Sequence, residues 1–144
     1  METDREIIYG FEDRKKGLPI SELAKLLATW QKKLGMDDWS LDLKIVDFKR
    51  KNGYRQSGDF VANLEKKTAT ILMTWEPWRG DEEYTLVHEM LHILVHEYDK
   101  FSEELILKNH EKWGSEHSEY LEKLENLVHH LTRVFLGRSD RDNN

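Results

Sequence analysis

Three histidines and two glutamates lie in one apolar stretch of the sequence, residues 85–97 (TLVHEMLHILVHE). On a helical wheel at 100° per residue, apolar side chains cover most of the circumference of this stretch. The remaining polar stripe carries His88, Glu89, His92 and His96. Because a helix that is apolar on most sides is expected to lie centrally in a fold, we expect this polar stripe to face a cleft.

The first two histidines have the spacing of metal ligands. His88 and His92 are one helical turn apart on the same face, so both imidazoles can reach one ion at about 2.0–2.1 Å. Glu89 lies beside them and is offset, so it can reach a water on the ion without being a ligand. Together they form the pattern H-E-x-x-H, in which the glutamate is the general base. We therefore predict a catalytic zinc site with Glu89 as the base.

The third histidine, His96, does not fit the same ion. At a rise of about 1.5 Å per residue it is about 12 Å along the helix from His88, which is too far while the helix persists. A chain reversal that brings it back would need a glycine, as in the longer pattern H-E-x-x-H-x-x-G-x-x-H. Residues 93–95 (ILV) contain none. His96 is therefore not predicted to be a ligand.

A third ligand must come from another element, because catalytic zinc usually has three protein ligands. Residues 118–131 form the next strong helical pattern. Its predicted buried stripe consists of Leu121, Leu124, Val128, Leu131 and Phe135. Glu125 borders this stripe, whereas Glu122 points away from it. We predict that Glu125 is the third ligand, and Glu122, His117 and His110 remain alternatives.

The other elements follow from apolar periodicity and from chain breakers. Helical spacing predicts a helix over residues 20–34, which Gly35 can end. Period-two alternation over residues 39–45 and 60–64 and the β-rich run at 68–74 predict three strands. The last two strands are joined by the charged turn Glu65-Lys66-Lys67, as in a hairpin.

Asp81 is a good N-cap for the helix that carries the histidines, which we expect to end near Tyr98. Helices packed on a small antiparallel three-stranded sheet give an α+β fold. The expected domain covers residues 17–136, between a charged, partly flexible segment at 1–16 and a flexible tail at 137–144.

Composition limits the classes of partner. The net charge of −6 argues against sequence-independent binding to nucleic acid or to an anionic membrane. The absence of cysteine excludes disulfides and cysteine-ligated zinc, so histidine and carboxylate are the strong metal ligands that remain. The start of the chain has no apolar core of signal-peptide length, and no run has the length of a membrane span. We therefore expect a cytoplasmic, monomeric protein.

The sequence VHEMLHILVH, followed later by LENLVHHL, resembles the compact gluzincins. These are the minigluzincins and the metallopeptidases of phages and prophages related to the ImmA/IrrE type. The resemblance covers most of residues 20–136 and implies a zincin-like fold with the glutamate ligand on the last helix. It also implies His88, His92 and Glu125 as zinc ligands, with Glu89 as base. The long segment between the two zinc helices, residues 99–117, departs from the pattern.

The implied activity is zinc-dependent hydrolysis of a peptide bond in a protein or peptide substrate. Glu89 would accept a proton from water and later deliver it to the departing amine. His129, one turn after Glu125, is a candidate donor to the oxyanion, although a surface histidine is the ordinary reading. A strand near residues 60–74 can pair with an extended peptide.

Two different functions would also fit the motif. An SprT-like protease would use a histidine such as His110 or His117 as third ligand, and it would usually have a basic surface or a nucleic-acid module. A zinc-bearing interaction module would bind another protein, such as a repressor or a virion component, without cutting it.

Overall fold

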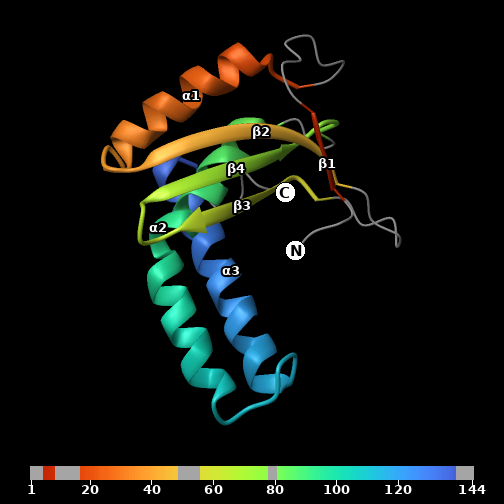
Figure 1. Cartoon of the computed structure of the whole chain (residues 1–144), viewed down its shortest axis with the longest axis vertical. Helices are drawn as coiled ribbons and strands as arrows, with labels where there is room; N and C mark the ends of the chain where they lie inside the picture. Colours follow the sequence, from red (N-terminus) through yellow and green to blue (C-terminus); the bar gives the residue numbers. More distant parts are fainter. Residues whose placement is uncertain (1–4, 9–16, 49–55, 78–80, 139–144) are drawn as a thin grey trace. The chain divides into compact units, whose positions relative to one another are not determined.

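The computed structural model describes residues 5–8, 17–48, 56–77 and 81–138 (Figure 1). Its elements in chain order are β1 (Arg5–Ile8), α1 (Ile20–Lys33), β2 (Ser40–Phe48), β3 (Gly58–Asn63), β4 (Thr68–Thr74), α2 (Glu82–Leu107) and α3 (Ser115–Phe135). The predicted α+β class is therefore confirmed. The chain divides into two compact units, residues 1–89 and 90–144. This division falls inside α2, and the single domain expected over residues 17–136 stays a prediction.

The sheet of the first unit has four strands in the order β1-β2-β4-β3. Strand β2 pairs in parallel with β4, while β1 pairs antiparallel with β2 and β3 pairs antiparallel with β4. The prediction of a three-stranded antiparallel sheet was therefore wrong. The chain leaves β2 and forms β3 at the edge of the sheet. The predicted hairpin turn then reverses the chain, and β4 returns between β3 and β2. It runs antiparallel to β3 and parallel to β2. Strand β1 lies inside the segment predicted to be partly flexible.

The central strand β4 explains the apolar run TATILMT. It has a partner strand on each side, and the side chains of Ala69, Ile71, Leu72 and Met73 are buried on its two faces. The turn before it contains Lys67 in the left-handed region (φ 53°). The ammonium group of Lys67 forms an ion pair with Asp38, and this hydrogen bond lowers the pKa of the Asp38 carboxyl.

Helix α1 and the segment just before it are joined to the first turn of α2 by two hydrogen bonds to acidic side chains. The indole N–H of Trp30 donates to Glu83 (2.7 Å), and the backbone N–H of Leu18 donates to Glu82 (2.5 Å). Asp81 caps α2 as predicted, because its carboxylate accepts from the backbone N–H of Tyr84 (3.2 Å). These contacts fix the start of the helix that carries the H-E-x-x-H motif.

In the second unit, the part of α2 from residue 90 onward and α3 form an antiparallel helical hairpin (Figure 1). Helix α2 ends at Leu107 and not near Tyr98. No glycine or proline interrupts residues 99–107, and this extension contacts α3. The hydroxyl of Tyr120 donates to Asp99 (2.6 Å), and Nε2 of His117 lies 2.6 Å from Glu103.

The apolar stripes predicted for these two helices are buried only in part. On α3 Val128 is fully buried, but Phe135 near the helix end is 47% exposed. On α2 the residues up to Ile93 are well buried, whereas Leu94 and Tyr98 are exposed. Among the residues that the structure describes, no helix has both the length and the apolar character that crossing a membrane requires.

Candidate metal centre

Helix α2 carries the H-E-x-x-H residues on two successive turns without a break. His88 and Glu89 are both buried, at 7% and 8% exposure, and the side chain of His92 is 15% exposed. The ring of His88 stacks on Tyr84, one turn earlier, with the planes 18° apart. Because the helix is continuous, His88 and His92 keep the spacing of one turn that a shared ion needs.

The carboxylate of Glu125 on α3 contacts His92 on α2. Oε1 of Glu125 lies 2.9 Å from Nε2 of His92, and the two residues are 33 positions apart in sequence. Glu125 was the residue predicted to reach this helix. Two donors at about 2.0–2.1 Å from one tetrahedral ion lie about 3.3 Å apart, which is close to this separation. The contact is a hydrogen bond, and its two atoms are of the types that ligate zinc.

The second oxygen of the same carboxylate faces another imidazole. Oε2 of Glu125 lies 3.3 Å from Nε2 of His129, one turn later on α3. Glu125 is thus held between His92 and His129, and the side chain of His129 is 35% exposed. This contact was not predicted, although the spacing i, i+4 could have indicated it. The role of His129 as an oxyanion donor stays a prediction.

His117, also considered above as a third ligand, has both ring nitrogens engaged inside the helical hairpin. It is fully buried, and its Nδ1 accepts from the backbone N–H of Trp113 (3.0 Å). The proton is therefore on Nε2, which donates to Glu103 (2.6 Å). Along α3 it is eight residues, or about 12 Å, from Glu125. His117 thus connects the ends of the two helices and lies away from His92.

His110 and Glu122 also lie apart from the contact between His92 and Glu125. His110 lies in the turn between α2 and α3, where its Nδ1 is 3.4 Å from Glu116. Glu122 is exposed on α3. Of the four residues considered for the third ligand, Glu125 is the one that the structure places against His92.

His96 lies on an uninterrupted part of α2, which is the condition on which the prediction that it is not a ligand depends. Helix α2 continues through His96 to Leu107, so no chain reversal brings it back toward His88. Burial lowers the pKa of His96, and the charge of Asp99 partly opposes this effect. Asp99 in turn accepts from Tyr120, whose pKa is raised by burial and by this hydrogen bond. These groups link the two helices beyond the candidate metal centre.

In the first unit, the edge strand β3 passes very close to Glu89. A Cβ atom on Gly58, the first residue of β3, would lie 2.8 Å from Cγ2 of Thr85 and 3.1 Å from Cγ of Glu89. Only a glycine allows this approach without a shift of the neighbours. This relationship was not predicted, although a glycine just before the alternating residues 60–64 was the available signal.

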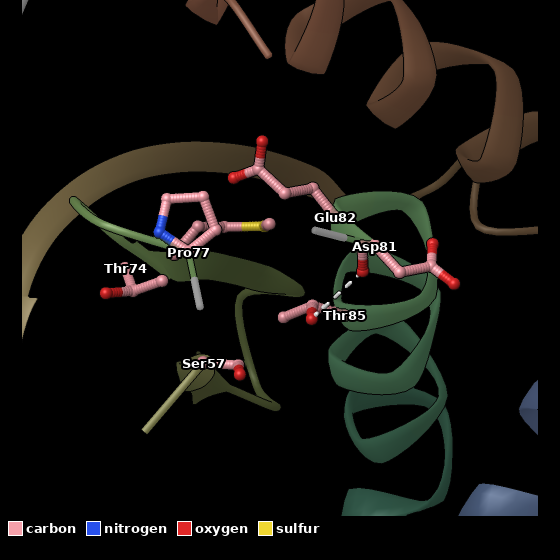
Figure 2. Close-up of a pocket in the computed structure, with 7 residues that line it drawn as sticks. Ser57, Thr74, Pro77, Asp81, Glu82 and Thr85 are labelled. Atoms are coloured by element: carbon pink, nitrogen blue, oxygen red, sulfur yellow. Dashed lines mark hydrogen bonds between the residues drawn. The ribbon is translucent and has the colours of Figure 1, made fainter. Parts of the chain in front are cut away.

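A small pocket lies beside the N-terminal turn of α2 (Figure 2). Its lining comes from the end of β4 and the start of α2, and consists of Ser57, Met73, Thr74, Pro77, Asp81, Glu82 and Thr85. The volume is about 210 Å³, including space open to solvent. Thr85 is one turn before Glu89 on α2, so the pocket borders the turn that carries the predicted base.

No protein-family model matches the chain, and no curated protein or solved structure is significantly similar to it. The resemblance to compact gluzincins therefore stays an expectation from the motif. The functional interpretation depends on the chemistry of the residues described above.

Proposed function

We propose that the protein is a zinc-dependent metallopeptidase in which His88, His92 and Glu125 hold the ion and Glu89 is the general base. The contact between His92 and Glu125 is the observation that supports this proposal most strongly. It brings a carboxylate from α3 to the second histidine of the motif, and imidazole and carboxylate are donors that suit zinc better than calcium or magnesium. His88 joins them from the preceding turn of the same helix.

When bound, the ion would polarise the peptide carbonyl and make its water more acidic. Glu89 is buried and sits next to His88 in sequence, on a helix whose start is fixed by the Asp81 cap. Its carboxylate would accept a proton from the water and deliver it to the departing amine. His129 would hold the Glu125 carboxylate in position, or donate to the oxyanion as the sequence analysis proposed.

The proposed substrate is an extended peptide segment that adds to the edge of the sheet at β3. This strand is the last in the order β1-β2-β4-β3, so one side of its backbone has no strand partner in the described sheet. Added strands bind to such edges through main-chain hydrogen bonds. Because Gly58 lets β3 approach Glu89 closely, a peptide on this edge would run near the base.

The decisive experiment compares Glu89→Gln with the wild-type protein and with Glu97→Gln, a change on an exposed part of α2. Zinc content is measured by elemental analysis, and hydrolysis is measured on unfolded protein substrates by mass spectrometry. We expect about one zinc per chain in all three proteins and hydrolysis in all except Glu89→Gln. A loss of at least 100-fold in that variant is expected for removal of a general base.

Two outcomes would contradict the proposal. If Glu89→Gln loses its zinc, the residue belongs to the metal ligands and not to the water. If the wild-type protein binds zinc stoichiometrically but cuts no substrate, and Glu89→Gln behaves identically, the non-catalytic interaction module is the better description. An SprT-like site would require zinc to depend on His110 or His117, and the contacts of His117 with Trp113 and Glu103 disfavour that arrangement.

A further inference from the structure

The exposed side of α2 in the second unit carries a continuous line of large apolar side chains. Leu94, Tyr98, Phe101 and Leu105 are 41%, 73%, 60% and 48% exposed. All four lie in the part of α2 that extends beyond the H-E-x-x-H motif. Single exposed apolar residues are ordinary on a protein surface, but a contiguous line of them marks an interaction site.

The spacing of these residues makes them one narrow stripe. The intervals along the chain are four, three and four residues, which keeps the side chains within about 60° of each other on a helix of 3.6 residues per turn. This is the pattern of the contact positions in paired helices. The same intervals are read from either end, so the stripe is symmetric about a point between Asp99 and Lys100.

We propose that this stripe is a dimer interface, at which α2 pairs antiparallel with α2 of a second copy of the chain around a two-fold axis between Asp99 and Lys100. The symmetric spacing then brings Leu94 opposite Leu105 of the other copy and Tyr98 opposite Phe101. A self-complementary patch is what a two-fold interface requires. The pairing is independent of the metal and of the proposed peptidase activity.

The size of the stripe suits a modest interface. Large side chains of this kind each have an area of about 150–250 Å². Multiplied by the exposed fractions of the four residues, this gives an exposed apolar area of roughly 400 Å² per chain. A stable interface buries about 800 Å² per partner, of which the centre is apolar and the rim polar. The stripe therefore supplies the apolar centre, and its polar neighbours must supply the rim. A dissociation constant in the micromolar range is expected.

The charges beside the stripe permit two copies to meet. Glu97, Lys100, Glu104 and Lys108 lie along one flank and are all exposed. Because two of them are acidic and two are basic, the flank has no net charge to oppose self-association. A strongly acidic or basic partner would find no matching surface there, which favours a second copy of the chain as the occupant.

The first test is the mass of the protein in solution by analytical ultracentrifugation at micromolar concentrations. We expect a species of twice 17.2 kDa that dissociates on dilution. Phe101→Lys should abolish it, while Leu127→Lys, which removes an apolar residue of similar exposure on α3, should leave it intact. Circular dichroism checks that both variants are folded. A wild-type protein that stays monomeric at 100 μM, or a dimer that survives Phe101→Lys, would overturn the proposal.

The second test reads the direction of pairing, and the chain has no cysteine to interfere. In the antiparallel dimer, the double variant Leu94→Cys/Leu105→Cys should form disulfide-linked dimers on mild oxidation. Within one chain these two positions are about 16 Å apart on the helix, beyond the reach of about 7 Å for a disulfide. Leu94→Cys alone should not cross-link, because its copies are equally far apart. Cross-linking of Leu94→Cys alone would show parallel pairing, in which the double variant cross-links as well, and would contradict a two-fold axis between Asp99 and Lys100.

Discussion

Glu125 on α3 lies 2.9 Å from His92 on α2, through Oε1 and Nε2, and the two residues are 33 positions apart in sequence. Both belong to the helical hairpin of the second unit. The contact joins the H-E-x-x-H motif to Glu125, the residue on α3 that was predicted as third ligand because it borders the apolar stripe of that helix. A bound ion shared by these residues would therefore hold the two helices together.

The first prediction concerns this contact. Glu125→Ala should lower zinc affinity by at least 100-fold, because it removes one of three proposed ligands. It should also lower the melting temperature of the zinc-loaded protein, because binding to the folded state alone stabilises that state. Glu122→Ala, on the exposed side of the same helix, should change neither quantity. Isothermal titration with zinc and differential scanning calorimetry measure the two effects.

A different result would identify another ligand. If zinc affinity falls in Glu122→Ala and not in Glu125→Ala, the proposed register of α3 at the ion is wrong. If His117→Ala instead abolishes binding while the fold is intact, the interpretation moves toward the SprT-like class. The structure argues against this result, since both nitrogens of His117 have partners within the hairpin.

The second prediction concerns His129. Because its Nε2 lies 3.3 Å from the second oxygen of Glu125, we expect His129→Ala to loosen that carboxylate and to lower zinc affinity. Loss of a group that orients a metal ligand typically costs 10- to 100-fold. His130→Ala, the exposed neighbour, is the matched control. Should zinc affinity stay unchanged while kcat falls, His129 acts on the substrate, as the oxyanion donor proposed from the sequence.

The relative placement of the candidate ligands on α2 was predictable from the sequence because helical geometry is local. A separation of four residues on a helix fixes the relation between His88 and His92 whatever the rest of the chain does. The position of Glu125 at the border of an apolar stripe was a weaker signal. The structure brings Glu125 into contact with His92, because the unbroken helix extends the register of the fully buried Val128 to its neighbours.

The sheet was predicted less well because strand pairing is not local. Alternation in residues 39–45 and the β-rich run at 68–74 identified two strands, but nothing in either segment shows that they pair in parallel. The four residues of β1 were too few for a periodic signal. The predicted end of α2 near Tyr98 was also wrong, because the helix continues to Leu107 with an exposed apolar stripe.

The third prediction is a dependence of stability on pH through His96. Burial lowers the pKa of His96 in the folded protein below its usual 6.5, so the unfolded chain binds this proton more readily than the folded one. The free energy of unfolding should therefore decrease as the pH falls below about 6.5, until the folded-state pKa is passed. His96→Gln should flatten this decrease. Urea titrations of the zinc-free protein between pH 7.5 and 5 measure it.

His130→Gln serves as the control for the pH experiment, since this histidine is exposed on α3. It should keep the wild-type slope. An NMR titration that places the pKa of His96 at or above 6.5 would contradict the assignment. In that case burial would be outweighed by the charge of Asp99, which acts in the opposite direction.

The fourth prediction concerns the close approach of β3 to α2 within the first unit. Gly58→Ala places a Cβ atom 2.8 Å from Cγ2 of Thr85 and 3.1 Å from Cγ of Glu89, so the strand must move. Overpacking of this kind typically costs about 1–3 kcal/mol, measurable by urea denaturation. Since the strand moves relative to the proposed base, peptidase activity should fall by more than the unfolded fraction explains. Thr85→Ser removes the closest methyl group and should restore part of the lost stability in the double variant, because the smaller side chain leaves room for the new Cβ. If Gly58→Ala is as stable as the wild type, or if Thr85→Ser gives no recovery, β3 does not pack against this turn of α2 as closely as the structure shows.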